Sequence, residues 1–274
     1  MKREIIVLGL AVAMLGSCTS DITEEAVNTG GRTELSVVLE ETRTHLGDKD
    51  ETSGAYKVYW SNGDCINICG HESNPLSGIE EGTGSATFYV DKVINPPYDV
   101  IYPASAYSDG DAVLPSVQQY AEESFAEGSA VLVGRGETSA VELKNACGFV
   151  KIRLTRGTAD DCNISYVKFY GNSDEAVSGR FGIDYAQAQL LLPETAASDE
   201  DKSITLECGD GVALSSEELS FVFAVPAQTF AAGFTVEIVD VEGHRMTHSS
   251  DREQIVNAGE ILAMPAMELS LIHI

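Results

Sequence analysis

Cys65, Cys69 and His71 are residue types that bind transition metals, and they lie within a stretch of seven residues. A structural zinc site takes four such ligands, usually as two closely spaced pairs. No second pair stands at a matching spacing in the sequence. We therefore interpret the three as ordinary strand residues, with part of a metal site as the alternative, and predict no metal and no cofactor.

Motifs of the common enzyme classes are also absent from the sequence. It contains no P-loop, no Gly-x-Ser-x-Gly nucleophile elbow and no His-Glu-x-x-His zinc helix. Cys147 lies beside Gly148 in an apolar stretch, which favours a small core residue over a nucleophile. His244 and His248 are four residues apart in a predicted strand and turn, so they share no helical face. The chain is predicted not to be an enzyme.

The chemistry that the sequence does predict lies at Cys18. Two basic residues precede a mostly apolar run over 5–15, which is shorter than the ~20 residues of a membrane span and typical of a signal peptide. The run leads to LGSC (15–18), which resembles the lipobox of bacterial lipoproteins, where the cysteine thiol receives a diacylglyceryl group. We predict a lipoprotein signal peptide over 1–17 and lipidation of Cys18, with an uncleaved anchor helix as the alternative.

Composition limits the partners of the mature chain. Residues 18–32 are small, polar and acidic, which predicts a flexible tether. The whole chain has a formal net charge of −26, so it repels nucleic acid and anionic membrane surfaces. Its contact with the outer membrane is therefore expected through the lipid anchor alone, and nucleic acid is not expected as a partner.

The pattern after the tether is typical of an all-β protein. Residues 33–40 alternate between apolar and polar, and Asn62-Gly63 predicts a hairpin turn before a strand over 65–69. The apolar run 221–226 predicts a central strand, and 234–241 turns at Glu242-Gly243 into a second hairpin. No stretch sustains a helical period; 116–125 and 184–192 hold at most a short helical turn.

Turn signals every ten or so residues favour β-sandwiches. A small, polar stretch near 135–140 separates two groups of strands. We predict two consecutive β-sandwich domains over 33–138 and 139–268. The last six residues, 269–274, resemble translated sequencing-adapter read-through and are interpreted as a non-native tail, with a terminal β-strand as the alternative.

Cysteine spacing argues against a disulfide-stabilised scaffold. Five cysteines follow Cys18, an odd number, so at least one stays unpaired within the chain. Cys65 and Cys69 would lie ~13 Å apart along one strand. A disulfide needs Cα atoms within ~7 Å, so these two are not expected to pair.

Several short motifs, in consistent order, resemble the fimbrillin family of lipoproteins, the type V pilin group of Bacteroidales. The matching segments are VYWSNGD (58–64), YDVIYPA (98–104), LPSVQQY (114–120), FAEG (125–128), LKNACG (143–148), SGRF (178–181), VPA (225–227) and GEI (259–261). The resemblance implies two transthyretin-like β-sandwich domains and a subunit of cell-surface fimbriae. It also implies strand exchange, in which a neighbouring subunit fills a groove by β-augmentation.

The resemblance further implies that a trypsin-like protease cuts near the N-terminus to open this groove. Two arginines are candidates for the cut. Cleavage after Arg32 would release only the tether, whereas cleavage after Arg43 would also remove the strand 33–40. Arg43 is the more effective site for polymerisation; the alternative is that both are ordinary surface residues.

We therefore predict a structural or adhesive fimbrial subunit on the cell surface, whose partners are other fimbrillin subunits, a processing protease and a surface ligand of unknown nature. The alternative is a permanently lipidated, glycan-binding surface lipoprotein. Tyr56, Tyr59 and Trp60 form the densest aromatic cluster and would be its platform. Strand alternation would bury part of this cluster and Trp60 precedes a tight turn, so we favour core packing as its use.

Overall fold

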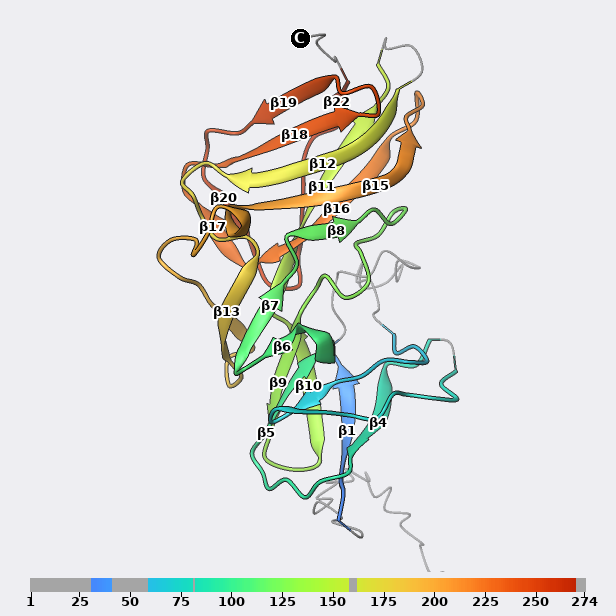
Figure 1. The fold of residues 1–274 in the computed structure, drawn as a ribbon, viewed down its shortest axis with the longest axis vertical. Helices are drawn as coiled ribbons and strands as arrows, with labels where there is room; N and C mark the ends of the chain where they lie inside the picture. Colours follow the sequence, from blue (N-terminus) through green and yellow to red (C-terminus); the bar gives the residue numbers. More distant parts are fainter. Residues whose placement is uncertain (1–30, 41–58, 81, 158–161, 270–274) are drawn as a thin grey trace, which may run out of the picture.

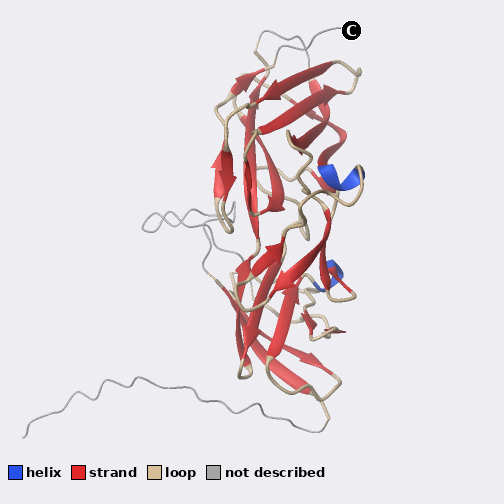
Figure 2. Ribbon diagram, turned by 90° about the vertical axis from the view of Figure 1, so that its left-hand side faces the viewer, coloured by secondary structure: helices blue, strands red, loops and turns tan. Residues whose placement is uncertain are grey.

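The computed structural model describes residues 31–40, 59–80, 82–157 and 162–269. These ranges form strands β1 to β22 and two 3-10 helices, η1 (Ala104–Ala106) and η2 (Glu200–Lys202), with no α-helix among them. No helix in this part of the chain is long and apolar enough to cross a membrane. The predicted all-β fold class is confirmed, and Figures 1 and 2 show the strands arranged in an elongated molecule.

The first sheet, which we call the N-terminal sheet, has the strand order β3-β2-β5-β9-β10-β1-β4. Its strands are β1 (Thr33–Leu39), β2 (Asn67–Ile68), β3 (His71–Glu72), β4 (Ser85–Val90), β5 (Tyr98–Tyr102), β9 (Leu132–Gly136) and β10 (Ala140–Asn145). Neighbours are antiparallel except β1 and β10, which are parallel. Apolar residues alternate along β1, β4 and β10, so one face of each strand enters a shared core.

Two further sheets pack together as the C-terminal sandwich. The first contains β11 (Cys147–Thr155), β16 (Leu219–Pro226), β21 (Ile261–Ala263) and β22 (Met267–Glu268). The second contains β8 (Val117–Gln119), β12 (Asn163–Gly171), β15 (Ser203–Ala213), β18 (Phe234–Asp240) and β19 (Arg245–Ser249). A two-stranded ribbon is formed by β17 (Gln228–Phe230) and β20 (Gln254–Val256). Phe169 lies at the centre of the shared core, with ring contacts to Phe223, Phe230 and Phe234.

A small four-stranded sheet, the junction sheet, lies beside the N-terminal sheet. It has the order β14-β13-β7-β6, with β6 (Tyr107–Ser108), β7 (Asp111–Leu114), β13 (Gly179–Asp184) and β14 (Gln189–Leu191). Leu114 and Phe181 pack in one cluster with Ile101 of β5 and Val133 of β9. Val100 and Leu132, their chain neighbours, belong to the core of the N-terminal sheet. The strands β5 and β9 are therefore buried on both faces.

The chain passes between the N-terminal sheet and the C-terminal sandwich three times (Figure 1). It leaves the sheet after β5 to form β8, returns for β9 and β10, and leaves again at β11. The predicted domain boundary between residues 138 and 139 stays a prediction. Hydrogen-bonded pairs join residues on its two sides, because β10 pairs with β1 and β9, and β8 pairs with β15.

The predicted hairpin around Asn62-Gly63 is wrong. A turn does form there, with Gly63 at a φ of +97°, but the segment 59–66 has no strand of its own. The hairpin lies further on, between β2 and β3, where Cys69 and Gly70 both adopt positive φ. The Asn67 side chain accepts a hydrogen bond from the Gly70 amide at 2.8 Å, which stabilises this turn. The predicted strand 65–69 is accordingly reduced to Asn67–Ile68, whereas the second predicted hairpin forms as β18 and β19.

The apolar run 221–226 forms β16 as predicted, but at the edge of its sheet rather than at its centre. Phe221, Phe223 and Val225 face the sandwich core. Val222 and Ala224 face the other way and pack with Phe125 and Ala130 of the segment 120–130, which we call the strap. A continuous apolar pattern indicates a strand that is buried on both faces. In β16 the strap, rather than a central position in the sheet, buries the second face.

The five described cysteines are free, and three of them, Cys147, Cys162 and Cys208, are buried. Burial raises the pKa of the Cys147 thiol to about 12, which fits the predicted core role. Leu269, the first residue of the predicted non-native tail, is 2% exposed in the sandwich core, and residues 270–274 lie outside the described part.

Candidate functional site

The strand β1 is inserted between β10 and β4, and it is hydrogen-bonded on both sides. It pairs in parallel with β10 from Ser36–Ala140 to Leu39–Leu143. On its other side it pairs antiparallel with β4, from Thr33–Val90 to Val38–Ser85. An inserted strand satisfies the backbone groups of two neighbours, so its loss would create two open edges that recruit another strand.

Three side chains of β1 point into the core of the N-terminal sheet. Leu35 and Val37 are fully buried and Leu39 is 5% exposed. The opposite face is open, with Val38 43% exposed. Each buried aliphatic side chain stabilises the fold by about 1.5–3 kcal/mol through burial alone. The contacts that hold the middle of β1 are thus apolar and follow the strand period of two.

At its beginning, β1 is fixed by a buried hydroxyl. Thr33 is 4% exposed, and its Oγ1 donates a hydrogen bond to the Lys92 carbonyl at 2.8 Å. The same oxygen accepts a hydrogen bond from the Ile94 amide at 2.8 Å. One hydroxyl therefore satisfies both a carbonyl and an amide of the loop that follows β4. The sequence pattern gave no sign of this role.

Beyond its end, β1 is fixed by an ion pair on the outer face. Glu40 lies 3.4 Å from the Lys144 ammonium of β10, and the Glu40 amide donates to the Leu143 carbonyl at 2.9 Å. Lys144 also lies 3.7 Å from Glu142. The attraction of Glu40, and then of Glu142, raises the pKa of Lys144.

Of the predicted processing and lipidation residues, the structure describes only Arg32. Its guanidinium lies 4.9 Å from the centre of the Tyr89 ring and forms an ion pair with Glu34. Arg32 immediately precedes the buried Thr33, so the residues that follow it are held in the sheet. Cys18 and Arg43 lie outside the described residues.

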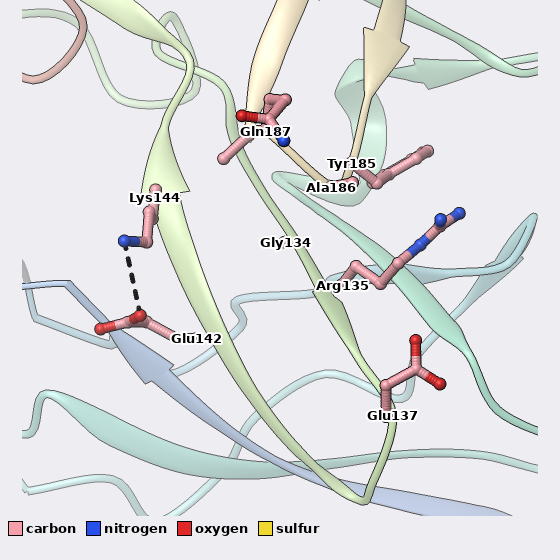
Figure 3. A pocket seen from close by; sticks show the side chains of 9 residues that line it. Gly134, Arg135, Glu137, Glu142, Lys144, Tyr185, Ala186 and Gln187 are labelled. Atoms are coloured by element: carbon pink, nitrogen blue, oxygen red, sulfur yellow. Dashed lines mark ion pairs between the residues drawn. The ribbon is translucent and has the colours of Figure 1, made fainter.

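A second candidate site is a surface pocket of about 520 Å³ between β9, β10 and the turn that joins β13 to β14. Figure 3 shows Glu142 and Lys144 on one side, Arg135 and Tyr185 on the other, and Gln187 between them. Arg135 is held by two hydrogen bonds to Asp99, at 2.6 and 2.9 Å. Burial, followed by the charge of Asp99, raises the pKa of Tyr185. The pocket is polar, nearly balanced in charge and lined by one half-buried aromatic ring.

The aromatic platform expected for glycan binding does not form around Trp60. The indole is 2% exposed and packs edge-on against Phe88 at 4.8 Å and Tyr102 at 5.1 Å. Tyr59 is 40% exposed, and Tyr56 lies outside the described residues. Trp60 is therefore a core residue.

The part of the chain that the structure describes contains no group of three or more His, Cys, Asp or Glu side chains placed to hold a metal ion. Cys69 instead accepts a hydrogen bond from the Asp99 amide at 3.3 Å. His71 lies 2.8 Å from the Lys92 ammonium, a cation that would compete with a bound metal.

No family model and no curated protein matches the chain. Among solved structures, a candidate cell adhesion protein from Bacteroides ovatus ATCC 8483 has a TM-score of 0.48 at 10% identity, covering 89% of this chain and 97% of its own. A candidate cell adhesion protein from Bacteroides uniformis ATCC 8492 has a TM-score of 0.42 at 14% identity, covering 87% and 95%. The tip fimbrial protein Mfa3 from Porphyromonas gingivalis has a TM-score of 0.34 at 9% identity, covering 79% and 81%.

The TM-scores of these three structural neighbours are all below 0.5. The identities are low, so the geometry of β1 has to carry the functional conclusion.

Proposed function

We propose that this chain is a structural or adhesive subunit of cell-surface fimbriae, in which β1 is removed by proteolysis and replaced by a strand of a neighbouring subunit. The observation that carries the proposal is the position of β1, which is paired on both edges and inserts alternate aliphatic side chains into the core. Removal of β1 would leave an apolar groove between two unpaired strands. Such a groove is the acceptor that β-augmentation needs.

Of the two candidate cleavage sites, we propose Arg43. A protease binds several residues on each side of the cut bond in extended form, and the residues after Arg32 are already hydrogen-bonded in the sheet. Cleavage after Arg32 would also leave β1 in place. Arg43 follows the last residue of β1 by four positions, so a cut there separates β1 from the rest of the chain.

Before processing, the subunit would be anchored in the outer membrane by a lipid on Cys18. The support for this anchor is the signal-peptide pattern and the lipobox-like LGSC sequence. Export in bacteria and metabolic labelling with a radioactive fatty acid test it directly. The label should enter the wild-type chain and be absent from Cys18→Ser.

Limited digestion of the chain from residue 19 onward with an arginine-specific endoprotease tests the processing step. Mass spectrometry locates the cut, and size-exclusion chromatography with unheated SDS gels detects oligomers. We expect a discrete cut after Arg43, followed by SDS-resistant oligomers when a subunit that supplies a donor strand is added. Arg43→Gln should prevent both, whereas Arg32→Gln should prevent neither. A chain in which cleavage after Arg43 leaves β1 bound and the protein monomeric, even when other subunits are added, would contradict strand exchange.

One observation favours a second function, a lipidated glycan-binding protein: the polar pocket lined by Arg135, Tyr185 and Gln187. Amide, charged and tyrosine side chains can bind the hydroxyl groups of a saccharide through hydrogen bonds. A glycan array with the intact chain tests this alternative. Binding that is lost in Gln187→Ala and kept in the exposed control Gln119→Ala would support it.

A further inference from the structure

Removal of β1 would leave specific polar groups without partners at one end of the groove. The Ile94 amide and the Lys92 carbonyl are both bonded to the Thr33 hydroxyl at 2.8 Å. Thr33 is 4% exposed, so water has little access to this position while a strand fills the groove. A buried backbone group without a hydrogen bond destabilises the structure. A replacing strand therefore has to bring a group that both donates and accepts here, which is the property of a hydroxyl.

The other end of the groove carries a positive charge. Lys144 projects from the outer face of β10 and lies 3.4 Å from Glu40 when β1 is in place. A strand with an acid at this position would restore the pair, whereas a basic residue would face Lys144 directly. The effect is modest, since Lys144 is 47% exposed and lies near Glu142 as well.

Between these ends, the groove accepts apolar side chains at every second position. Leu35 lies opposite Phe88, Val37 opposite Ala86 and Val141, and Leu39 opposite Leu143. The direction is also fixed, because a strand running the other way with its apolar side chains in the core would place neither its hydroxyl at the Lys92 carbonyl nor its acid at Lys144. The groove thus requires a hydroxyl at one end, favours an acid at the other, and accepts apolar side chains at alternate positions between them.

We infer that the groove selects an incoming strand by a three-part pattern: a Ser or Thr first, apolar residues at the third, fifth and seventh positions, and an Asp or Glu at the eighth, running parallel to β10. The partner is an extended segment of another subunit with this chemistry. This inference rests on the proposed strand exchange and adds the rule by which a strand is accepted. Within the 274 residues, only Thr33–Glu40 has the pattern, so the sequence of β1 itself is the suitable probe.

Peptide exchange into the cleaved protein tests the rule. The chain is cut after Arg43, or at a protease site inserted there, and the β1 segment is exchanged in moderate urea for fluorescein-labelled peptides. The reference peptide has the sequence of residues 32–42, RTELSVVLEET. Variants carry Thr33→Val or Glu40→Lys, and the control Ser36→Ala removes the exposed hydroxyl of β1. Fluorescence anisotropy after removal of the urea gives the affinity.

We expect the Thr33→Val peptide to bind roughly tenfold more weakly than the reference, since two part-buried backbone groups lose their partner. The Glu40→Lys peptide should bind about threefold to fivefold more weakly. In a Lys144→Glu protein the Glu40→Lys peptide should bind more tightly than the reference peptide. A merely structural effect would not reverse the preference. The Ser36→Ala peptide should bind like the reference.

The peptide experiment distinguishes strand exchange itself from the rule that selects the strand. Failure of every peptide, including the reference, to bind the cleaved protein would overturn strand exchange and the rule together. Equal binding of the reference, Thr33→Val and Glu40→Lys peptides would overturn the rule and leave strand exchange standing.

Discussion

The strands β1 and β8 each pair in parallel with a strand that is distant in the chain, yet they are held in different ways. β1 buries three aliphatic side chains, and its specific polar contacts lie at its ends. β8 pairs with β15 and buries only Gln118, which is 1% exposed. The Gln118 amide donates to the Ala224 carbonyl at 2.7 Å and accepts from the Ala224 amide at 3.0 Å. Gln118 thus links β8 to both sheets of the C-terminal sandwich.

This difference indicates which of the two strands another segment can replace. Apolar side chains at alternate positions occur in many strands, so another segment can supply what the middle of β1 supplies. A buried glutamine that reaches one particular backbone residue is rarely matched by chance. In addition, β8 lies between two parts of a continuous chain and continues into the strap, where Phe125 stacks on Phe149 at 4.5 Å.

The largest expected effect is in the core face of β1. Leu35→Ala should lower the free energy of unfolding by about 2–5 kcal/mol, because it removes a fully buried aliphatic side chain. Val38→Ala, on the open face of the same strand, should change it by less than about 0.5 kcal/mol. Urea unfolding followed by fluorescence measures both. Equal effects of the two substitutions would contradict the conclusion that one apolar face holds β1 in the sheet.

The next effect concerns β8. Gln118→Ala should lower the free energy of unfolding by about 1–3 kcal/mol, since the amide and carbonyl of Ala224 lose their partner. The exposed neighbour Gln119 provides the matched control, and Gln119→Ala should be close to neutral. If Gln118→Ala is neutral too, the hydrogen bonds of this side chain do not hold β8 in place. The proposed difference between β8 and β1 would then be wrong.

A smaller effect is the pH-dependent contribution of Glu123, in the strap, to the stability of the protein. Burial raises the pKa of Glu123, but hydrogen bonds from Ser220 and Lys151 outweigh it and leave the pKa below its ordinary value. A lowered folded-state pKa gives stability that is present above the ordinary value and is lost as the pH falls through the folded one. Glu123 is 52% exposed, so we expect about 0.2–1 kcal/mol. Melting curves from pH 7 to pH 3 should show a shallower loss of stability in Glu123→Gln than in the wild type.

The smallest effect has the opposite pH dependence and concerns the end of β1. Glu40, followed by Glu142, raises the pKa of Lys144 above its ordinary 10.5. This contribution is present below that value and is lost as the pH rises through the raised pKa. Glu40→Gln should therefore destabilise the protein by about 0.2–1 kcal/mol at pH 8 and have less effect near pH 11.5. A substitution effect that persists unchanged at high pH would show that Glu40 acts through packing rather than charge.

Local patterns predict β1 correctly, because its apolar alternation is contained in its own residues and needs no knowledge of its partners. β8 is different. The stretch 116–125 has no strand period and was predicted to hold at most a short helical turn, whereas Val117–Gln119 form a strand because β15 offers its edge. The same limit applies to the site. The partners of the Thr33 hydroxyl lie 59 and 61 residues away, and no local signal marks Lys144 as the neighbour of Glu40.

The three passes of the chain between the N-terminal sheet and the C-terminal sandwich have a mechanical consequence. A subunit within a fibre carries tension along its long axis. A single linker between the two regions would bear the whole load, and its extension would separate them without breaking a sheet. Here three segments share the load in parallel, and the packing of Leu114 and Phe181 of the junction sheet against Ile101 and Val133 of the N-terminal sheet resists separation as well. These contacts act together, so the molecule should behave under load as one stiff link.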